Sequence, residues 1–212
     1  MLFDFDHTLG VDHRLEETVL AELSQRYCAA PFSDERIGTS LSLFRTGSLS
    51  LADMLRSAFD GCACGDDFVN LYKARALELL PTRLEPLPGA QTTIKALQTG
   101  GLTVAILSNG WTELQVAKAA EIGFEGSVYV SESIGAWKPD VRAFEIATQG
   151  LDVSPTRSMY VGDSPLTDVV GAKSANMVAV WADLEGRSYP VGAIEPDYAI
   201  TSLEQIIELI DV

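Results

Sequence analysis

Two aspartates near the start of the chain are the residues best suited to chemistry. Asp4 and Asp6 alternate with phenylalanines, which is the period-two pattern of a short strand, and Gly10 then breaks the pattern. Two carboxylates on one side of a strand that is ending repel each other unless a cation or a reaction employs them. One can act as a nucleophile, the other can transfer a proton, and a divalent metal can neutralise the pair. The alternative is an acidic loop, because so short a motif also matches by chance.

The composition is that of an acidic globular protein. The 212 residues are 47% hydrophobic, enough for one folded unit or a core with a modest insertion, and the formal net charge is -15. Such a surface repels nucleic-acid phosphates and anionic membranes, so we expect neither as a partner. No apolar run approaches about 18 residues and no leader pattern opens the chain, so we expect a soluble, cytoplasmic protein. The oligomeric state is left open between monomer and dimer.

The chain has three cysteines, which bear on the cellular compartment: Cys28, Cys62 and Cys64. An odd count without a paired framework is typical of a reducing compartment. Cys62 and Cys64 resemble a fragment of a metal site, but no histidine lies close to them in the sequence and a second cysteine pair is missing. We therefore expect no zinc site.

Two kinds of pattern divide the chain. Between residues 11 and 84 apolar residues recur at helical spacing, and Pro81 is the first of three prolines predicted to end all helix there. The remainder alternates apolar strands with amphipathic helices, as repeated βα units do. The predicted fold is α/β, with a doubly wound parallel sheet over residues 1–10 and 85–212. An inserted helical bundle is predicted over residues 11–84.

Polar motifs follow three later predicted strands. Ser108, Asn109 and Gly110 close an apolar strand, where hydroxyl and amide groups can donate to phosphate oxygens, although the same residues are common in turns. Lys138 precedes a predicted helix, where it either neutralises a nucleophilic carboxylate or stays solvated.

Asp163 and Asp168 make up the last motif. Asp163 ends a predicted strand and Asp168 falls on the first turn of the next helix. Two oxygen ligands so placed suit magnesium, while helix capping is the other interpretation.

The four motifs together resemble the haloacid dehalogenase-like (HAD) hydrolase superfamily. Asp-x-Asp-x-Thr, Ser-Asn, Lys-Pro and Gly-Asp-x4-Asp stand at four strand ends in the order that this family has them. The resemblance covers the core from Met1 to about Val180. The helical segment between the first two motifs resembles the family's helical cap of the first type.

The resemblance implies a role for each motif residue. Asp4 would attack phosphorus, Asp6 would protonate the leaving group and then activate water, and Lys138 would steady the nucleophile. The residues implied in phosphate binding are Thr8, Ser108, Asn109 and Gly110. Those implied in binding Mg²⁺ are Asp4, Asp6 (through its backbone carbonyl), Asp163 and Asp168, the last either as a ligand or as an orienting residue.

Three further residues are candidates for substrate contact. His7 stands where many relatives have glycine, and either touches the substrate or faces solvent. Trp111 either lines the cleft between cap and core or packs in the core. Arg45 is the cap cation most suited to substrate charge, and an exposed, salt-bridged arginine is the alternative.

The predicted function is a magnesium-dependent phosphomonoester hydrolase that works through an aspartyl-phosphate. Its small substrate would be phosphoglycolate-, nucleotide- or sugar-phosphate-like. A 2-haloacid dehalogenase needs neither a metal nor a proton donor, so Asp6 and Asp163 argue against it. A phosphosugar mutase would retain all four motifs, and a non-catalytic phospholigand-binding module is the alternative from another class.

Overall fold

The computed structural model describes residues 1–63 and 67–210 of the chain. The chain divides into two compact units. Residues 1–11 together with the chain from residue 85 onward form an α/β unit, and residues 12–84 form a helical unit.

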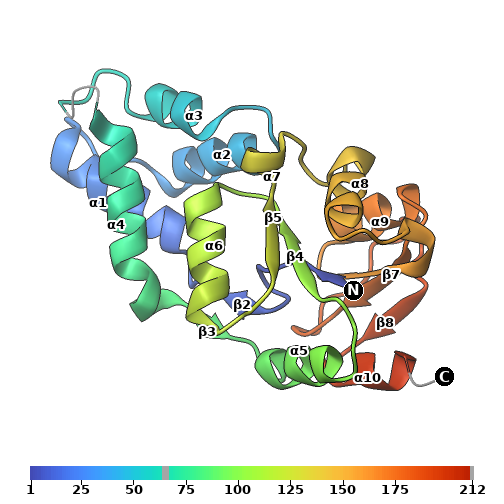
Figure 1. Cartoon of the computed structure of the whole chain (residues 1–212). Coiled ribbons are helices and arrows are strands. Elements are labelled where there is room, and N and C mark those ends of the chain that lie inside the picture. Colours follow the sequence, from blue (N-terminus) through green and yellow to red (C-terminus); the bar gives the residue numbers. More distant parts are fainter. Residues whose placement is uncertain (64–66, 211–212) are drawn as a thin grey trace. The chain divides into compact units, whose positions relative to one another are not determined.

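In the described part of the chain, the α/β unit is built on a six-stranded sheet in which every pair of neighbours is parallel (Figure 1). The strands in spatial order are β5 (Ser127–Val130), β4 (Ala105–Ser108), β1 (Leu2–Phe3), β6 (Met159–Gly162), β7 (Val178–Ala182) and β8 (Tyr198–Ile200). The chain order reverses at β1, and ligands of such sheets bind beyond the carboxyl ends of the strands at the reversal. The prediction of a doubly wound parallel sheet is confirmed.

Helices cover both faces of this sheet. They are α5 (Ala90–Thr99), α6 (Thr112–Glu121), α7 (Ser131–Ile134), α8 (Val141–Gly150), the 3₁₀ turn η2 (Pro155–Arg157), the π-helical turn η3 (Pro165–Val169), α9 (Val170–Ser174) and α10 (Gln205–Ile210). Helix α5 packs beside α10 and α8 beside α9, and Figure 1 shows these two pairs on opposite sides of the sheet. The buried core that joins α8 and α9 to the sheet includes Phe144 of α8 together with Tyr160 and Trp181.

A two-stranded ribbon marks the place where the chain leaves the α/β unit and returns to it. Strand β2 (Gly10–Val11) pairs antiparallel with β3 (Glu85–Pro86). A tight turn precedes β2, in which His7 has φ 58° and the main-chain N–H of Leu9 donates to the carbonyl of Phe5 at 2.8 Å. This turn follows β1 directly and therefore fixes the backbone that carries the first motif.

The helical unit contains α1 (Leu15–Tyr27), α2 (Asp34–Arg45), α3 (Leu51–Ala58) and α4 (Phe68–Arg83). The prediction that Pro81 ends all helix is wrong, because α4 continues to Arg83. A proline in the last turn removes one backbone donor, and the N–H of Leu84 still bonds the carbonyl of Leu80 at 2.9 Å.

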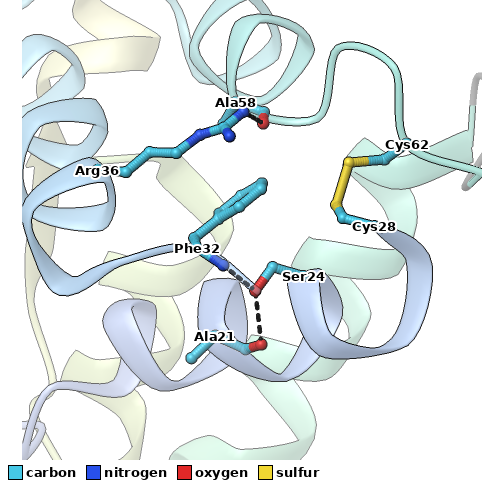
Figure 2. The surroundings of a disulfide bond; sticks show 7 residues. All are labelled: Ala21, Ser24, Cys28, Phe32, Arg36, Ala58 and Cys62. Carbon is cyan, nitrogen blue, oxygen red and sulfur yellow. Dashed lines mark hydrogen bonds between the residues drawn. A yellow bond between two sulfur atoms is a disulfide. The ribbon is translucent and has the colours of Figure 1, made fainter. Parts of the chain in front are cut away.

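A disulfide joins Cys28, just after α1, to Cys62, which follows α3 (Figure 2). Beside it, the N–H of Phe32 donates to the hydroxyl of Ser24 at 3.0 Å, and the guanidinium of Arg36 lies 4.1 Å from the centroid of the Phe32 ring. The disulfide thus lies next to contacts that join α1 to α2.

The disulfide corrects the expectation that the cysteines are unpaired. Cys28 and Cys62 are 34 residues apart in the sequence, and only the folded helices bring their Cα atoms to 4.4 Å. Disulfides are typical of oxidising compartments, so the cysteine argument for a cytoplasmic location loses its premise. Cys64 lies outside the described residues. No helix in residues 1–63 and 67–210 has the length and apolar character that crossing a membrane requires.

Candidate active site

Three neighbouring strands bring the motifs together at one edge of the sheet. Asp4 follows β1, Ser108 ends β4, and Asp163 follows β6. The main-chain N–H of Asp4 donates to the carbonyl of Val161 at 2.8 Å, which extends the pairing of β1 and β6 to the first aspartate. The carboxyl ends of parallel strands share an edge, which is why residues distant in the sequence meet here.

Lys138 lies at the centre of this cluster and is buried. Its Nζ is 2.7 Å from Oδ1 of Asp4, 2.8 Å from Oδ1 of Asp168 and 2.6 Å from the hydroxyl of Tyr160. That hydroxyl donates in turn to the carbonyl of Leu107 at 2.8 Å. Burial alone would lower the pKa of Lys138, but the attraction of Asp168 and Asp4 outweighs it and raises the pKa. The lysine is therefore a fixed positive charge against Asp4.

The Ser108–Gly110 turn supports the lysine. The main-chain N–H of Lys138 donates to Oδ1 of Asn109 at 2.9 Å, and Nδ2 of Asn109 donates to the carbonyl of Lys138 at 3.0 Å. The N–H of Gly110 donates to the hydroxyl of Ser131 at 2.9 Å, and Ser108 is buried. The side chain of Asn109 therefore holds the loop that carries Lys138; phosphate binding by these residues stays a prediction.

Three carboxylates lie close enough to share a cation. Oxygens of Asp4, Asp163 and Asp168 are all within 4.8 Å of one another. Burial raises the pKa of Asp4 to about 8; Lys138 opposes this shift, while Asp168 and Asp163 add to it. Burial, and then the charge of Asp168, also raises the pKa of Asp163. Mg²⁺ prefers hard oxygen ligands, and a cation bound here would favour the charged carboxylates that burial disfavours, so these residues fit the ion.

Asp168 is held rigidly at this cluster. Its Oδ2 accepts the main-chain N–H of Ser164 at 2.9 Å, while its Oδ1 faces Lys138. A Cβ at Gly162 would lie 2.4 Å from the carboxyl carbon of Asp168. Glycine is therefore needed at the end of β6 for the Asp168 side chain to reach the site.

Asp6 does not belong to the group of three carboxylates, because α6 holds its side chain. Nζ of Lys118 is 2.8 Å from Oδ1 of Asp6, and Nε2 of Gln115 donates to Oδ2 at 3.1 Å. Sequence reasoning missed both α6 residues. Lys118 and Gln115 are buried on the face of α6 that also carries Leu114, so the available signal was a lysine within an apolar stripe.

A second group missed from the sequence lies after β7. The guanidinium of Arg187 is 2.8 Å from Oδ2 of Asp163 and 3.3 Å from Oε2 of Glu185. Oε1 of Glu185 is 2.8 Å from Nδ1 of His7, whose side chain is 54% exposed. No pattern in this irregular segment signals that it reaches the first and last motifs.

The remaining predicted residues are placed as follows. Trp111 is fully buried immediately before α6. In the helical unit, the guanidinium of Arg45 lies 3.2 Å from Glu16 and 3.3 Å from Glu17. Thr8 is buried, and its hydroxyl has no hydrogen-bond partner among the described residues.

The fold and this arrangement of residues define a class of enzyme. A family model described as haloacid dehalogenase-like hydrolase matches residues 1–176. The chain belongs to the haloacid dehalogenase-like hydrolases, as the order of its motifs predicts.

Individual relatives and solved structures match the chain over different shares of its length. The pyrimidine 5'-nucleotidase YjjG of Escherichia coli (strain K12) is 24% identical, over 99% of this chain and 93% of its own length. A phosphoserine phosphatase of Thermus thermophilus is 34% identical over 56% of this chain, a match that spans 49% of that protein. The crystal structure of a HAD phosphatase from Thermococcus onnurineus is similar with a TM-score of 0.74 and 26% identity, covering 99% of this chain and 96% of that one. Haloacid dehalogenases are relatives as well, so the family alone does not choose between the two reactions.

Proposed function

We propose that the protein is a magnesium-dependent phosphomonoester hydrolase that forms an aspartyl-phosphate on Asp4. The observation that carries the proposal is the cluster in which Lys138 contacts both Asp4 and Asp168, while oxygens of Asp4, Asp163 and Asp168 lie within 4.8 Å. Displacement of halide from carbon needs a carboxylate nucleophile but no metal. A set of carboxylates that can bind a cation therefore favours phosphoryl transfer.

The residues proposed to hold the ion are Asp4, Asp163 and Asp168, together with the backbone carbonyl of Asp6, with Asp168 acting either directly or by orienting the others. Mg²⁺ bound there supplies positive charge that offsets the repulsion between an anionic nucleophile and an anionic ester. Lys138 supplies a second positive charge from the loop between α7 and α8.

In the first step, a carboxylate oxygen of Asp4 bonds to phosphorus as the bond from phosphorus to the leaving oxygen breaks. Asp6 gives its proton to that oxygen, so the alcohol leaves neutral. In the second step, Asp6 takes a proton from water, whose oxygen attacks phosphorus and breaks the bond to Asp4. Inorganic phosphate is released and both aspartates return to their starting state.

The buried hydroxyl of Thr8 suits a place beside the phosphoryl group. A buried hydroxyl without a partner is costly, and a phosphate oxygen would satisfy it. Ser108, Asn109 and Gly110 are proposed to complete the phosphate site from the end of β4.

We propose that the helical unit acts as the cap, and that it restricts the enzyme to small phosphorylated metabolites. One relative that matches over 93% of its own length is a pyrimidine 5'-nucleotidase, so we rank nucleoside monophosphates first among the substrates to test. Phosphoglycolate-like and sugar-phosphate-like esters come next. His7, Arg45 and Trp111 remain the proposed specificity residues.

A panel of phosphorylated metabolites, assayed for released phosphate, tests the proposal. Activity should disappear with EDTA, return with Mg²⁺ and fall with Ca²⁺, whose larger and looser coordination would misplace the nucleophile. Lys173→Met serves as a control variant, because it removes a lysine from an ion pair with Asp197 that lies outside the cluster. Its dependence on Mg²⁺ should equal that of the wild-type protein.

Three other outcomes would each assign a different function to the protein. Metal-independent halide release from a 2-haloacid would make the protein a dehalogenase. Transfer of the phosphoryl group to another sugar hydroxyl, without free phosphate, would make it a mutase. Mg²⁺ binding with no turnover of any ester would leave a binding module.

A further inference from the structure

Lys118 is a buried cation that none of the sequence motifs contains. Its side chain is 2% exposed, yet its Nζ reaches Oδ1 of Asp6 at 2.8 Å. Burying an ammonium group is costly unless it is paired and hydrogen-bonded. A lysine on the inner face of α6 is therefore expected to have a specific use for its charge.

Gln115 holds the other oxygen of the same carboxylate. Its Nε2 donates to Oδ2 of Asp6 at 3.1 Å and to the carbonyl of Asn109 at 3.3 Å. Gln115 and Lys118 are three residues apart and so lie on one face of the helix. A Cβ at Gly110 would lie 2.8 Å from Nε2 of Gln115, so the turn after β4 leaves the space that this side chain occupies.

We propose that Lys118, assisted by Gln115, is a positioning residue that fixes the Asp6 carboxylate for proton transfer. The inference rests on the proposed function, in which Asp6 is the acid and base. The Asp6 side chain is 34% exposed, and a carboxylate on a loop would otherwise sample several rotamers. Donors on both oxygens restrict the group to one orientation, and the charge of Lys118 stabilises the carboxylate that forms as the proton moves from Asp6 to the leaving oxygen.

The helix gives this arrangement its rigidity. Lys118 and Gln115 lie in the middle of α6 beside Leu114 and Ala119, all buried. Donors on a packed helix hold a loop carboxylate more precisely than donors on another loop would. A chain that displaced halide would need no such arrangement, because halide leaves without a proton.

The test compares two esters that differ only in the leaving group. Phenolate is more basic than p-nitrophenolate and depends more on a proton donor. With phenyl phosphate, Lys118→Met should lower kcat/KM by about tenfold or more, and with p-nitrophenyl phosphate by less than about threefold. Because kcat/KM covers steps up to departure of the alcohol, it reports the proton transfer directly. Lys118→Arg should restore part of the loss.

A double-mutant cycle with Asp6→Asn separates positioning from general damage. If Lys118 acts through Asp6, the double variant should be no slower with phenyl phosphate than Asp6→Asn alone. Additive losses, or equal losses of Lys118→Met with both esters, would overturn the inference. Lys173→Met should change neither ester. If Lys118→Met does not fold, Gln115→Met is judged by the same ratio of losses.

Failure of the inference and failure of the proposed function give different results. Asp6→Asn should lose more kcat/KM with phenyl phosphate than with p-nitrophenyl phosphate, which is the leaving-group dependence. If Asp6→Asn shows it and Lys118→Met does not, only the role of Lys118 is refuted. If Asp6→Asn also lacks the dependence, or if the wild-type protein releases phosphate from no ester, the proposed function fails and the inference fails with it.

Discussion

Removing the positive charge of Lys138 should strongly destabilise the α/β unit in the absence of metal. Lys138 is 3% exposed and contacts Asp4 and Asp168, both buried. Methionine keeps most of the length of the side chain and removes the charge, which leaves the two carboxyl groups of Asp4 and Asp168 without their shared cation. Breaking a buried ion pair by removing one partner costs about 3–5 kcal/mol.

The loss of unfolding free energy caused by Lys138→Met should increase with pH. Because the pKa of Asp4 is raised to about 8 in the folded protein, its contribution to stability is present at low pH and is lost as the pH rises through that value. Lys138 lowers this pKa, so Lys138→Met moves the loss to still higher pH and makes it larger. We therefore expect Lys138→Met to cost more at pH 9 than at pH 6.

Urea unfolding in EDTA, followed by tryptophan fluorescence, measures this cost. The tryptophans, Trp111, Trp137 and Trp181, all belong to the α/β unit, so the helical unit does not contribute to the signal. The control is Lys173→Met, whose ion pair is about one-third exposed and should be worth less than about 1 kcal/mol. A cost for Lys138→Met equal to that of the control, or one that does not grow with pH, would refute the reasoning.

Three more predictions follow from the same geometry. Asp4→Asn should stay folded and lose turnover, because an amide cannot attack phosphorus; activity within about tenfold of wild type would contradict the covalent mechanism. Arg187→Met removes a cation 2.8 Å from Asp163 and should tighten Mg²⁺ binding by about two- to fivefold in calorimetry, whereas weaker binding would show that Arg187 supports the site. Cys62→Ser should destabilise the helical unit by about 2–4 kcal/mol in circular dichroism and leave the tryptophan midpoint unchanged; a shift of both would mean that the two units unfold together.

The residues that the sequence could place are those that end strands. Asp4, Ser108 and Asp163 each follow an apolar run, and parallel pairing alone brings such positions to one edge. The parallel sheet follows from alternating βα units, whereas the order of its strands is known only from the structure.

The residues that the sequence could not place lie outside the strand ends and outside the four motifs. Lys118 reads as a surface lysine unless the inner face of its helix is known, and Tyr160 reads as an ordinary strand residue. Arg187 lies in an irregular segment with no periodicity. Cys28 and Cys62 become neighbours only when α1 and α3 pack, since pairing depends on distances in the fold.

The most direct test of the central claim is to trap the covalent intermediate. The Asp6→Asn variant, mixed with Mg²⁺ and p-nitrophenyl phosphate, should still form the aspartyl-phosphate, because p-nitrophenolate leaves with little help. It should then hydrolyse this intermediate slowly, because the base that activates water is missing. After rapid acid quenching, mass spectrometry should find one phosphoryl group on the peptide that contains Asp4, and none when Asp4 is also replaced by asparagine. A phosphoryl group on another residue, or turnover with no covalent adduct, would contradict the account.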